Sequence, residues 1–295
     1  MRAAISNWAK DKLNATGEFD VLPLIGSKEL VAWLPTILQS KSVNFPEIAY
    51  PTYRVGAIVA GAAEAAVEIS PQNWPKADLT WVNSPANPTG RVHSDDEYLA
   101  AIAWARNNNS ILISDECYLD FGDTAQPTSI LQYTQGDNRN ILAVHSLSKR
   151  SSMAGYRGAF LIGDKDLIAR IREVRKHAGM MVPLPIQKAM KVALSDEKHV
   201  AEQRARYNAR RAKLAPALIA AGFQIEFSNA GLYLWCTRNE SDWDSVAWLA
   251  NLGILATPGN FYGLLGNLHI RIAMTATDAQ IDQATQRIFS AIDEL

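Results

Sequence analysis

The sequence Val144-His145-Ser146-Leu147-Ser148-Lys149-Arg150 decides how the rest of this chain is interpreted, because it places a lysine just after the apolar run Ile141–Val144. That run predicts a buried strand, and burial at a strand end disfavours the charged ammonium of Lys149. Since a neutral amine condenses with an aldehyde, Lys149 is a candidate Schiff-base lysine. Ser146 and Arg157 are close enough in sequence to hold a phosphate. Together they point to a phosphorylated aldehyde as cofactor.

A second informative stretch, Ser114-Asp115-Glu116-Cys117-Tyr118, follows the apolar run Ile111–Ile113. Ligands of open α/β sheets gather outside the carboxyl ends of the strands. An aspartate at such an end could keep the ring nitrogen of pyridoxal phosphate protonated, so that the ring remains an electron sink. Tyr118 could donate its hydroxyl to the ring oxygen.

Three further motifs follow or precede apolar segments. Asn87 lies in a loop that two prolines and a glycine make rigid, with its amide free to meet a ligand oxygen. Gly26-Ser27-Lys28-Glu29 opens a helical pattern, and backbone amides at a helix start favour an anion. Tyr50-Pro51-Thr52-Tyr53 offers an aromatic plane for a flat ring.

Each motif taken singly has an ordinary structural explanation. A lysine beside serines is usually a solvated loop residue, and an aspartate at a strand end is more often a cap or turn residue. Ser27 would serve equally well as a helix cap, and Tyr53 as a core residue. The functional interpretation therefore rests on the combination.

The combination resembles the class I/II aminotransferases, which are fold-type I pyridoxal phosphate enzymes, over essentially the whole chain. The strings that carry the resemblance are Gly26-Ser27-Lys28-Glu29, Pro51-Thr52-Tyr53, Asn87-Pro88-Thr89-Gly90, Asp115-Glu116-Cys117-Tyr118, Ser146-Leu147-Ser148-Lys149, Arg157 and His269-Ile270-Arg271-Ile272-Ala273. The resemblance implies an α/β fold. It consists of a mostly parallel seven-stranded sheet with helices on both faces, plus a smaller α+β C-terminal domain.

The resemblance also implies a role for each matching residue. Lys149 binds the cofactor covalently and moves the proton. The implied cofactor-binding residues are Ser27, Lys28 through backbone amides, Tyr53 by stacking, Asn87, Asp115 at the ring nitrogen, Tyr118, Ser146, Ser148 and Arg157. Arg271, with Asn87, would bind the substrate α-carboxylate, because a guanidinium meets a carboxylate bidentately. Without the resemblance, Arg271 would be interpreted as a surface arginine at a strand edge.

The C-terminal strings narrow the resemblance within the family. Ala230–Trp235, Pro258–Gly263 and Arg271–Thr277 look most like the actinobacterial type of N-succinyldiaminopimelate aminotransferase. That branch serves lysine biosynthesis with glutamate as amino donor, which implies small amino and keto acids as partners and a homodimer. Another class I/II aminotransferase of the aspartate or alanine type remains an alternative, as does a pyridoxal phosphate lyase that cleaves a carbon–sulfur bond.

Bulk properties exclude several other classes. The 295 residues carry a net charge of −1, so no general attraction to nucleic acid or to anionic membranes is indicated. Cys117, Cys236 and the five histidines show no metal-ligand spacing, and we expect no metal. No run is long and apolar enough to span a membrane, and no secretory signal is present at the start. The expected location is the cytoplasm.

Alternating strand and helix patterns predict a large cofactor domain over residues 1–180 and linking helices with a small domain over 181–295. The predicted strands of the first part are Val21–Ile25, Ile48–Tyr50, Ala66–Ile69, Leu79–Val82, Ile111–Ser114, Ile141–Val144 and Gly158–Ile162. From Phe223 the pattern is strand, strand, helix, strand, strand, helix. Members of the resembled family carry several dozen residues before the segment that matches Met1–Lys12. We therefore expect a translation start upstream of Met1, with an inactive truncated copy as the alternative. A further alternative, the effector-binding half of a regulator, is disfavoured because the sequence shows no DNA-binding segment.

Overall fold

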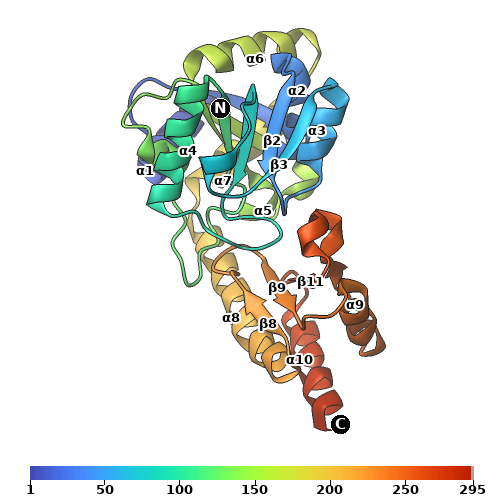
Figure 1. Cartoon of the computed structure of the whole chain (residues 1–295). Coiled ribbons are helices and arrows are strands. Elements are labelled where there is room, and N and C mark those ends of the chain that lie inside the picture. The colour runs from blue at the N-terminus through green and yellow to red at the C-terminus, as the bar shows by residue number, and fades with distance from the viewer. Residues whose placement is uncertain (294–295) are drawn as a thin grey trace.

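The computed structural model describes residues 1–293, which form two β-sheets with helices packed around each (Figure 1). The larger sheet has seven strands in the order β1-β7-β6-β5-β4-β2-β3. Strand β7 runs antiparallel to both of its neighbours, and the pairs from β6 to β3 are parallel. The strands are β1 (Asp20–Ile25), β2 (Ser42–Pro46), β3 (Ala63–Val67), β4 (Leu79–Asn83), β5 (Ile111–Asp115), β6 (Ile141–Ser146) and β7 (Gly158–Gly163). The predicted mostly parallel α/β sheet is confirmed.

Helices cover both faces of this sheet, which explains why its central strands are apolar on both sides. Side chains of α1, α4 and α7 pack in one hydrophobic cluster, and those of α2, α3 and α6 pack in another on the opposite face. These helices are α1 (Arg2–Leu13), α2 (Ser27–Leu38), α3 (Thr52–Ala60), α4 (Asp95–Asn108), α6 (Lys165–His177) and α7 (Leu184–Ser195). The short α5 (Leu147–Arg150) follows β6 directly.

The smaller sheet is antiparallel and has the order β10-β11-β9-β8. Its elements are β8 (Gln224–Glu226), β9 (Tyr233–Thr237), α9 (Asp242–Asn251), β10 (Thr257–Pro258), β11 (His269–Ala273) and α10 (Asp278–Asp293). The order predicted from Phe223 onward is therefore confirmed, with residues 294–295 outside the described part. In Figure 1, α8 (Lys198–Ala220) runs from the larger sheet toward the smaller one and lies beside α10.

One predicted strand is wrong. Residues 48–50 lie in a loop, and the strand of this region is β2 at Ser42–Pro46. The buried Asn44 interrupts the apolar pattern of β2, and its side-chain amide donates to the carbonyl of Pro75 over 2.8 Å. The polar interior residue and the terminal proline hide this strand from a hydrophobicity pattern.

The carboxyl ends of β1, β4, β5 and β6 meet at one edge of the larger sheet. Asp115 at the end of β5 pairs in register with Asn83 of β4 and Val144 of β6. Strand β7 begins at the same edge, where Gly158 pairs with Ile25 at the end of β1. Because this edge faces the smaller sheet, side chains from both sheets can line a common space (Figure 1).

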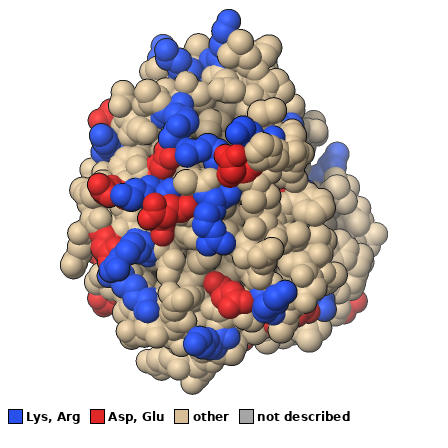
Figure 2. Space-filling model, turned by 90° about the horizontal axis from the view of Figure 1, so that it is seen from above, with Lys and Arg blue, Asp and Glu red and all other residues tan. Residues whose placement is uncertain are grey.

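Figure 2 views the molecule from above, on the side of α6, and shows basic and acidic side chains intermingled over that face. This pattern fits the near-zero net charge of −1. Within residues 1–293, none of the helices has the length and apolar character needed to cross a membrane.

Candidate active site

A cavity of about 320 Å³ lies at the carboxyl edge of the larger sheet, against the smaller sheet. Its size falls in the range of about 300–1,000 Å³ that is usual for small-molecule sites. The cavity is lined by Ser27, Lys28, Tyr50, Tyr53, Asn83, Asn87, Asp115, Cys117, Tyr118, Ser146, Ser148, Lys149, Ala154, Arg157, Tyr233 and Arg271. The structure thus brings together every residue that the sequence predicts for the site.

Lys149 reaches this cavity because β6 ends at Ser146 and the chain turns at once into α5. The Ser146 hydroxyl accepts a hydrogen bond from the Ser148 backbone N–H at 3.1 Å and so fixes the turn. Lys149 is half-buried, and no carboxylate of residues 1–292 lies within ion-pair distance of its Nζ. The amine is therefore not engaged by a structural partner.

Asp115 is buried at the end of β5, and donors hold both of its carboxylate oxygens. The Tyr53 hydroxyl donates to Oδ2 at 2.8 Å, and the Cys117 backbone N–H donates to Oδ1 at 3.1 Å. Burial raises the pKa of Asp115, while the hydrogen bonds from Cys117 and Tyr53 act in the opposite direction. A protonated ring nitrogen placed here would recover the electrostatic energy that burial of the carboxylate costs.

Tyr53 has contacts that differ from those expected for a stacking residue. Its ring is fully buried and stacks on Trp81 at 5.1 Å between centroids, and its hydroxyl is the one that holds Asp115. Tyr50 from the same motif is half-buried, lines the cavity, and lies edge-on to Tyr53. The stacking role of Tyr53 stays a prediction, and Tyr50 is a second aromatic side chain at this wall.

An anion would find its donors where β1 passes into α2. Gly26 precedes the helix with φ of 79°, and a Cβ atom there would lie 2.3 Å from Nη2 of Arg157. Only glycine therefore lets the Arg157 guanidinium approach the start of this twelve-residue helix. Ser27 is the first helical residue, and its side chain caps no backbone N–H, so the alternative interpretation of Ser27 as a cap is wrong. Free backbone amides and a guanidinium together suit a phosphate.

Arg271 and Asn87 meet across the two sheets. Nη1 of Arg271 donates to Oδ1 of Asn87 at 2.9 Å, which leaves the Asn87 Nδ2 hydrogens available for a ligand oxygen. Asn87 is itself held by its backbone N–H, which donates to Oδ1 of Asn83 at 2.8 Å. The Arg271 guanidinium lies 4.1 Å from the ring centre of Tyr233 and 5.0 Å from that of Tyr262.

Some lining residues were not assigned from the sequence. Asn83 ends an apolar strand, a signal of the kind that identified Asp115. Tyr50 stood in a motif that was already recognised. Tyr233 stands in the string Ala230–Trp235, but that string does not indicate its contact with Tyr118, 2.9 Å between hydroxyl oxygens, because the two residues are 115 positions apart.

The residues fit pyridoxal phosphate when considered in order along the cavity. A buried carboxylate suits the protonated ring nitrogen, the unengaged amine of Lys149 suits the aldehyde, and the α2 start with Arg157 suits the phosphate. An arginine with free hydrogen-bonding capacity then remains for a substrate carboxylate, since the buried Nε of Arg271 has no partner among the described residues. The fold and site define the class as a pyridoxal phosphate enzyme.

Comparison with known proteins identifies the family. Residues 1–288 match the model of the aminotransferase class I and II family, so the chain belongs to this family of enzymes, which depends on pyridoxal phosphate. It is 51% identical over 280 residues to a probable aminotransferase of Mycobacterium tuberculosis, covering 92% of this chain and 66% of that protein. It is 46% identical over 298 residues to the 4-dedimethylamino-4-oxo-anhydrotetracycline transaminase of Streptomyces rimosus, covering 98% of this chain and 82% of that protein.

A solved structure leads to the same family. A probable N-succinyldiaminopimelate aminotransferase from Thermus thermophilus superposes with a TM-score of 0.89 at 26% identity, covering 98% of this chain and 83% of that one. The predicted family, fold and cofactor are confirmed by these matches.

Proposed function

We propose that this chain transfers an amino group between glutamate or 2-oxoglutarate and a second amino or keto acid, with Lys149 binding pyridoxal phosphate. The observation that carries the proposal is the convergence of Lys149, Asp115 and Arg271 on one cavity. These residues come from β5, from the turn after β6 and from β11 of the other sheet.

The roles of the residues follow from their positions. Bound pyridoxal phosphate supplies an electron sink for charge that develops at the substrate α-carbon. Lys149 Nζ takes the α-proton of the amino donor and would pass it to the carbon that carries the cofactor's aldehyde, a proton transfer worth roughly 10²–10⁴-fold in rate. Asp115 keeps the ring nitrogen protonated by its negative charge. Arg271, held by Asn87, binds the α-carboxylate and orients the α-hydrogen toward Lys149.

For the second substrate we propose N-succinyl-LL-2,6-diaminopimelate, in lysine biosynthesis. The support is the resemblance of the C-terminal strings and the structural likeness to the Thermus thermophilus protein. More distant support comes from an LL-diaminopimelate aminotransferase of Aquifex aeolicus, 31% identical over 310 residues, with 97% of this chain and 80% of that protein covered. The likeness to the Streptomyces rimosus transaminase favours a second candidate, a bulky cyclic ketone as amino acceptor.

A panel of amino acceptors tests the proposal. The purified chain, loaded with pyridoxal phosphate, is assayed with glutamate against the succinylated keto acid, oxaloacetate, pyruvate and a cyclic ketone. Production of 2-oxoglutarate with one acceptor supports amino transfer and identifies the partner. Release of pyruvate and ammonia from cystathionine, without amino transfer, would instead establish the lyase alternative.

Borohydride reduction followed by peptide mass mapping tests the linkage independently of turnover. The reduced pyridoxyl label is expected on Lys149. A label on any other lysine, or no label on the loaded chain, contradicts the proposal.

We further propose a homodimer in the cytoplasm, with a division near residue 180 into a cofactor domain and a smaller domain. The smaller sheet has a hydrophobic cluster of its own, which supports two domains, and α7 packs on the larger sheet, which fits its place among the linking helices. Light scattering on the loaded chain tests the dimer, limited proteolysis tests the boundary, and cell fractionation tests the location. A monomeric mass, a first cleavage within β1–β7, or recovery with membranes would contradict these three proposals in turn.

A further inference from the structure

Tyr233 contacts two other residues of the cavity, Tyr118 through its hydroxyl and Arg271 through its ring. It is the first residue of β9 in the smaller sheet, and it is buried at the cavity wall. Its hydroxyl oxygen lies 2.9 Å from that of Tyr118, which follows β5 of the larger sheet. Its ring lies 4.1 Å from the guanidinium carbon of Arg271. One side chain thus joins the group predicted for the cofactor ring to the group predicted for the substrate.

The contact with Arg271 depends on the ring of Tyr233. A guanidinium over an aromatic face is attracted by the ring's quadrupole, and the attraction grows when water is excluded. Tyr262 contacts the same guanidinium from farther away, at 5.0 Å, and Asn87 accepts from its Nη1. The three contacts hold the guanidinium in one orientation while Nε and Nη2 remain available for a carboxylate.

The contact with Tyr118 depends on the hydroxyl of Tyr233. Burial raises the pKa of Tyr118 well above its ordinary value, so Tyr118 stays protonated and able to donate. Either hydroxyl can donate in this pair, and when Tyr118 gives its hydrogen to a ring oxygen, Tyr233 becomes the donor to Tyr118. That hydrogen bond polarises Tyr118 and strengthens the one that Tyr118 donates onward.

We propose that Tyr233 is a positioning residue with two separable actions, the ring orienting Arg271 for the substrate carboxylate and the hydroxyl strengthening donation by Tyr118 to the ring oxygen of pyridoxal phosphate. This assignment rests on the proposed function. Both actions come from one residue of the smaller sheet. The sheet that carries Arg271 would therefore also set the strength of the hydrogen bond to the cofactor's ring oxygen.

Two substitutions separate the actions. Tyr233→Phe keeps the ring and removes the hydroxyl, whereas Tyr233→Leu removes both, with Tyr233→Met as a second variant of similar volume if the leucine variant misfolds. Tyr207→Phe serves as control, because Tyr207 is a buried tyrosine of the same hydrophobic cluster that does not line the cavity. All variants are loaded with pyridoxal phosphate, and only variants whose melting temperature matches that of the parent are compared.

The hydroxyl is tested by titrating the visible absorbance of the bound cofactor with pH, in the absence of substrate. A donor to the ring oxygen competes for the proton that this oxygen shares with the lysine–cofactor nitrogen, so a weaker donor raises the titration midpoint. Tyr233→Phe should move the midpoint upward by about 0.4 to 1 pH unit. A midpoint equal to that of the parent overturns this half of the assignment.

The ring is tested by binding of glutarate, a dicarboxylate that cannot react, measured by calorimetry. Tyr233→Leu should weaken glutarate roughly 3- to 30-fold, and Tyr233→Phe less than about twofold. Equal affinity in the leucine variant overturns this half. The two failures can be told apart in the parent protein. If the proposed function is wrong, the loaded parent shows no cofactor absorbance that depends on Lys149. If only the role of Tyr233 is wrong, the parent still shows that absorbance.

Discussion

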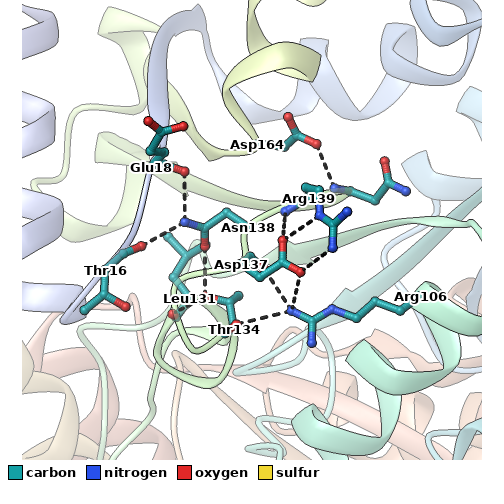
Figure 3. A network of polar contacts seen from close by, with 10 residues as sticks. Thr16, Glu18, Arg106, Leu131, Thr134, Asp137, Asn138, Arg139 and Asp164 are labelled. Atoms are coloured by element: carbon teal, nitrogen blue, oxygen red, sulfur yellow. Dashed lines mark hydrogen bonds and ion pairs between the residues drawn. The ribbon is translucent and has the colours of Figure 1, made fainter.

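Polar side chains gather at both edges of the larger sheet, but the two groups are satisfied in different ways. At the edge away from the cavity, Asn138 is buried and uses its whole side chain (Figure 3). Its Nδ2 donates to the carbonyls of Thr16 and Glu18 at 2.8 and 3.1 Å, and its Oδ1 lies 2.9 Å from the Thr134 hydroxyl. At the cavity edge, by contrast, the amine of Lys149 and Nε of Arg271 have no partner among residues 1–292.

The difference separates a polar network built for stability from one built for a ligand. Buried polar groups are nearly always hydrogen-bonded, and an unpaired one costs free energy. Around Asn138 the protein itself supplies the partners, including Arg106, whose Nη2 donates to the carbonyls of Thr134 and Asp137 (Figure 3). At the cavity the partners are left for the ligand to supply. Substitutions at the two edges should therefore affect different properties.

The largest effect is expected for Lys149→Ala. Amino transfer should fall by at least roughly 10²–10⁴-fold, because the proton-transfer base is removed. The free energy of unfolding without cofactor should stay within about 0.5 kcal/mol of the parent, since Lys149 has no partner to lose. Steady-state kinetics and denaturant unfolding measure the two quantities. The exposed Lys165→Ala should leave both kinetics and cofactor binding unchanged, and a parent-like rate for Lys149→Ala would reject the assigned role.

Arg271→Gln should raise the KM for glutamate roughly 10- to 100-fold, because a charged, bidentate partner of the carboxylate is lost. Cofactor binding should change little, since Arg271 lies on the substrate side of the cavity. The matched control is Arg287→Gln on α10, whose Nη1 donates to the carbonyl of Leu252 far from the cavity. An unchanged KM in Arg271→Gln, measured with saturating cofactor, would remove Arg271 from the substrate site.

Asn138→Ala should lower stability and leave activity unchanged, the reverse of what is expected for Lys149→Ala and Arg271→Gln. The substitution removes the donor to the carbonyls of Thr16 and Glu18 and one acceptor of the Thr134 hydroxyl, which should lower the free energy of unfolding by about 1–3 kcal/mol. Glutamate turnover per folded molecule should be unchanged. Chemical denaturation and single-turnover assays check the pair of outcomes, with Asn108→Ala as the comparison because its amide donates only within its own helix. A Lys149-like loss of activity in Asn138→Ala would break the distinction between the edges.

The same distinction explains what the sequence could and could not predict. Asp115 and Lys149 were predictable because each directly follows an apolar strand, and parallel strands bring their carboxyl ends to one edge. Strand β2 was missed because Asn44 is polar yet buried and satisfied by a carbonyl 31 positions away. Neither the hydrogen bond from Tyr53 to Asp115 nor the contact of Tyr233 with Tyr118 has a local signature, since each joins segments that only the folded chain brings together.

His93 should have no effect on activity at pH 7, and its effect on stability should appear only at acidic pH. Burial lowers the pKa of His93 to about 4, against the attraction of Glu97 and with the help of Arg91. The unfolded chain therefore binds more protons than the folded one between about pH 6.5 and pH 4, and stability should fall across this window as the pH is lowered. The slope should reach up to about 1.4 kcal/mol per pH unit.

His93→Phe preserves an aromatic ring against Tyr98, on which His93 stacks at 5.3 Å, and removes the titration. Denaturant unfolding at pH 7, 6, 5 and 4 should show the parent losing stability relative to this variant below pH 6.5, and the difference should level off below pH 4. Activity at pH 7 should be the same in both proteins, because His93 is neutral there and does not line the cavity around Lys149. Parallel stability curves for the two proteins would mean that His93 is charged when folded. A charged imidazole at this depth would need a counter-charge, and the candidate is Glu97, whose attraction raises the pKa of His93.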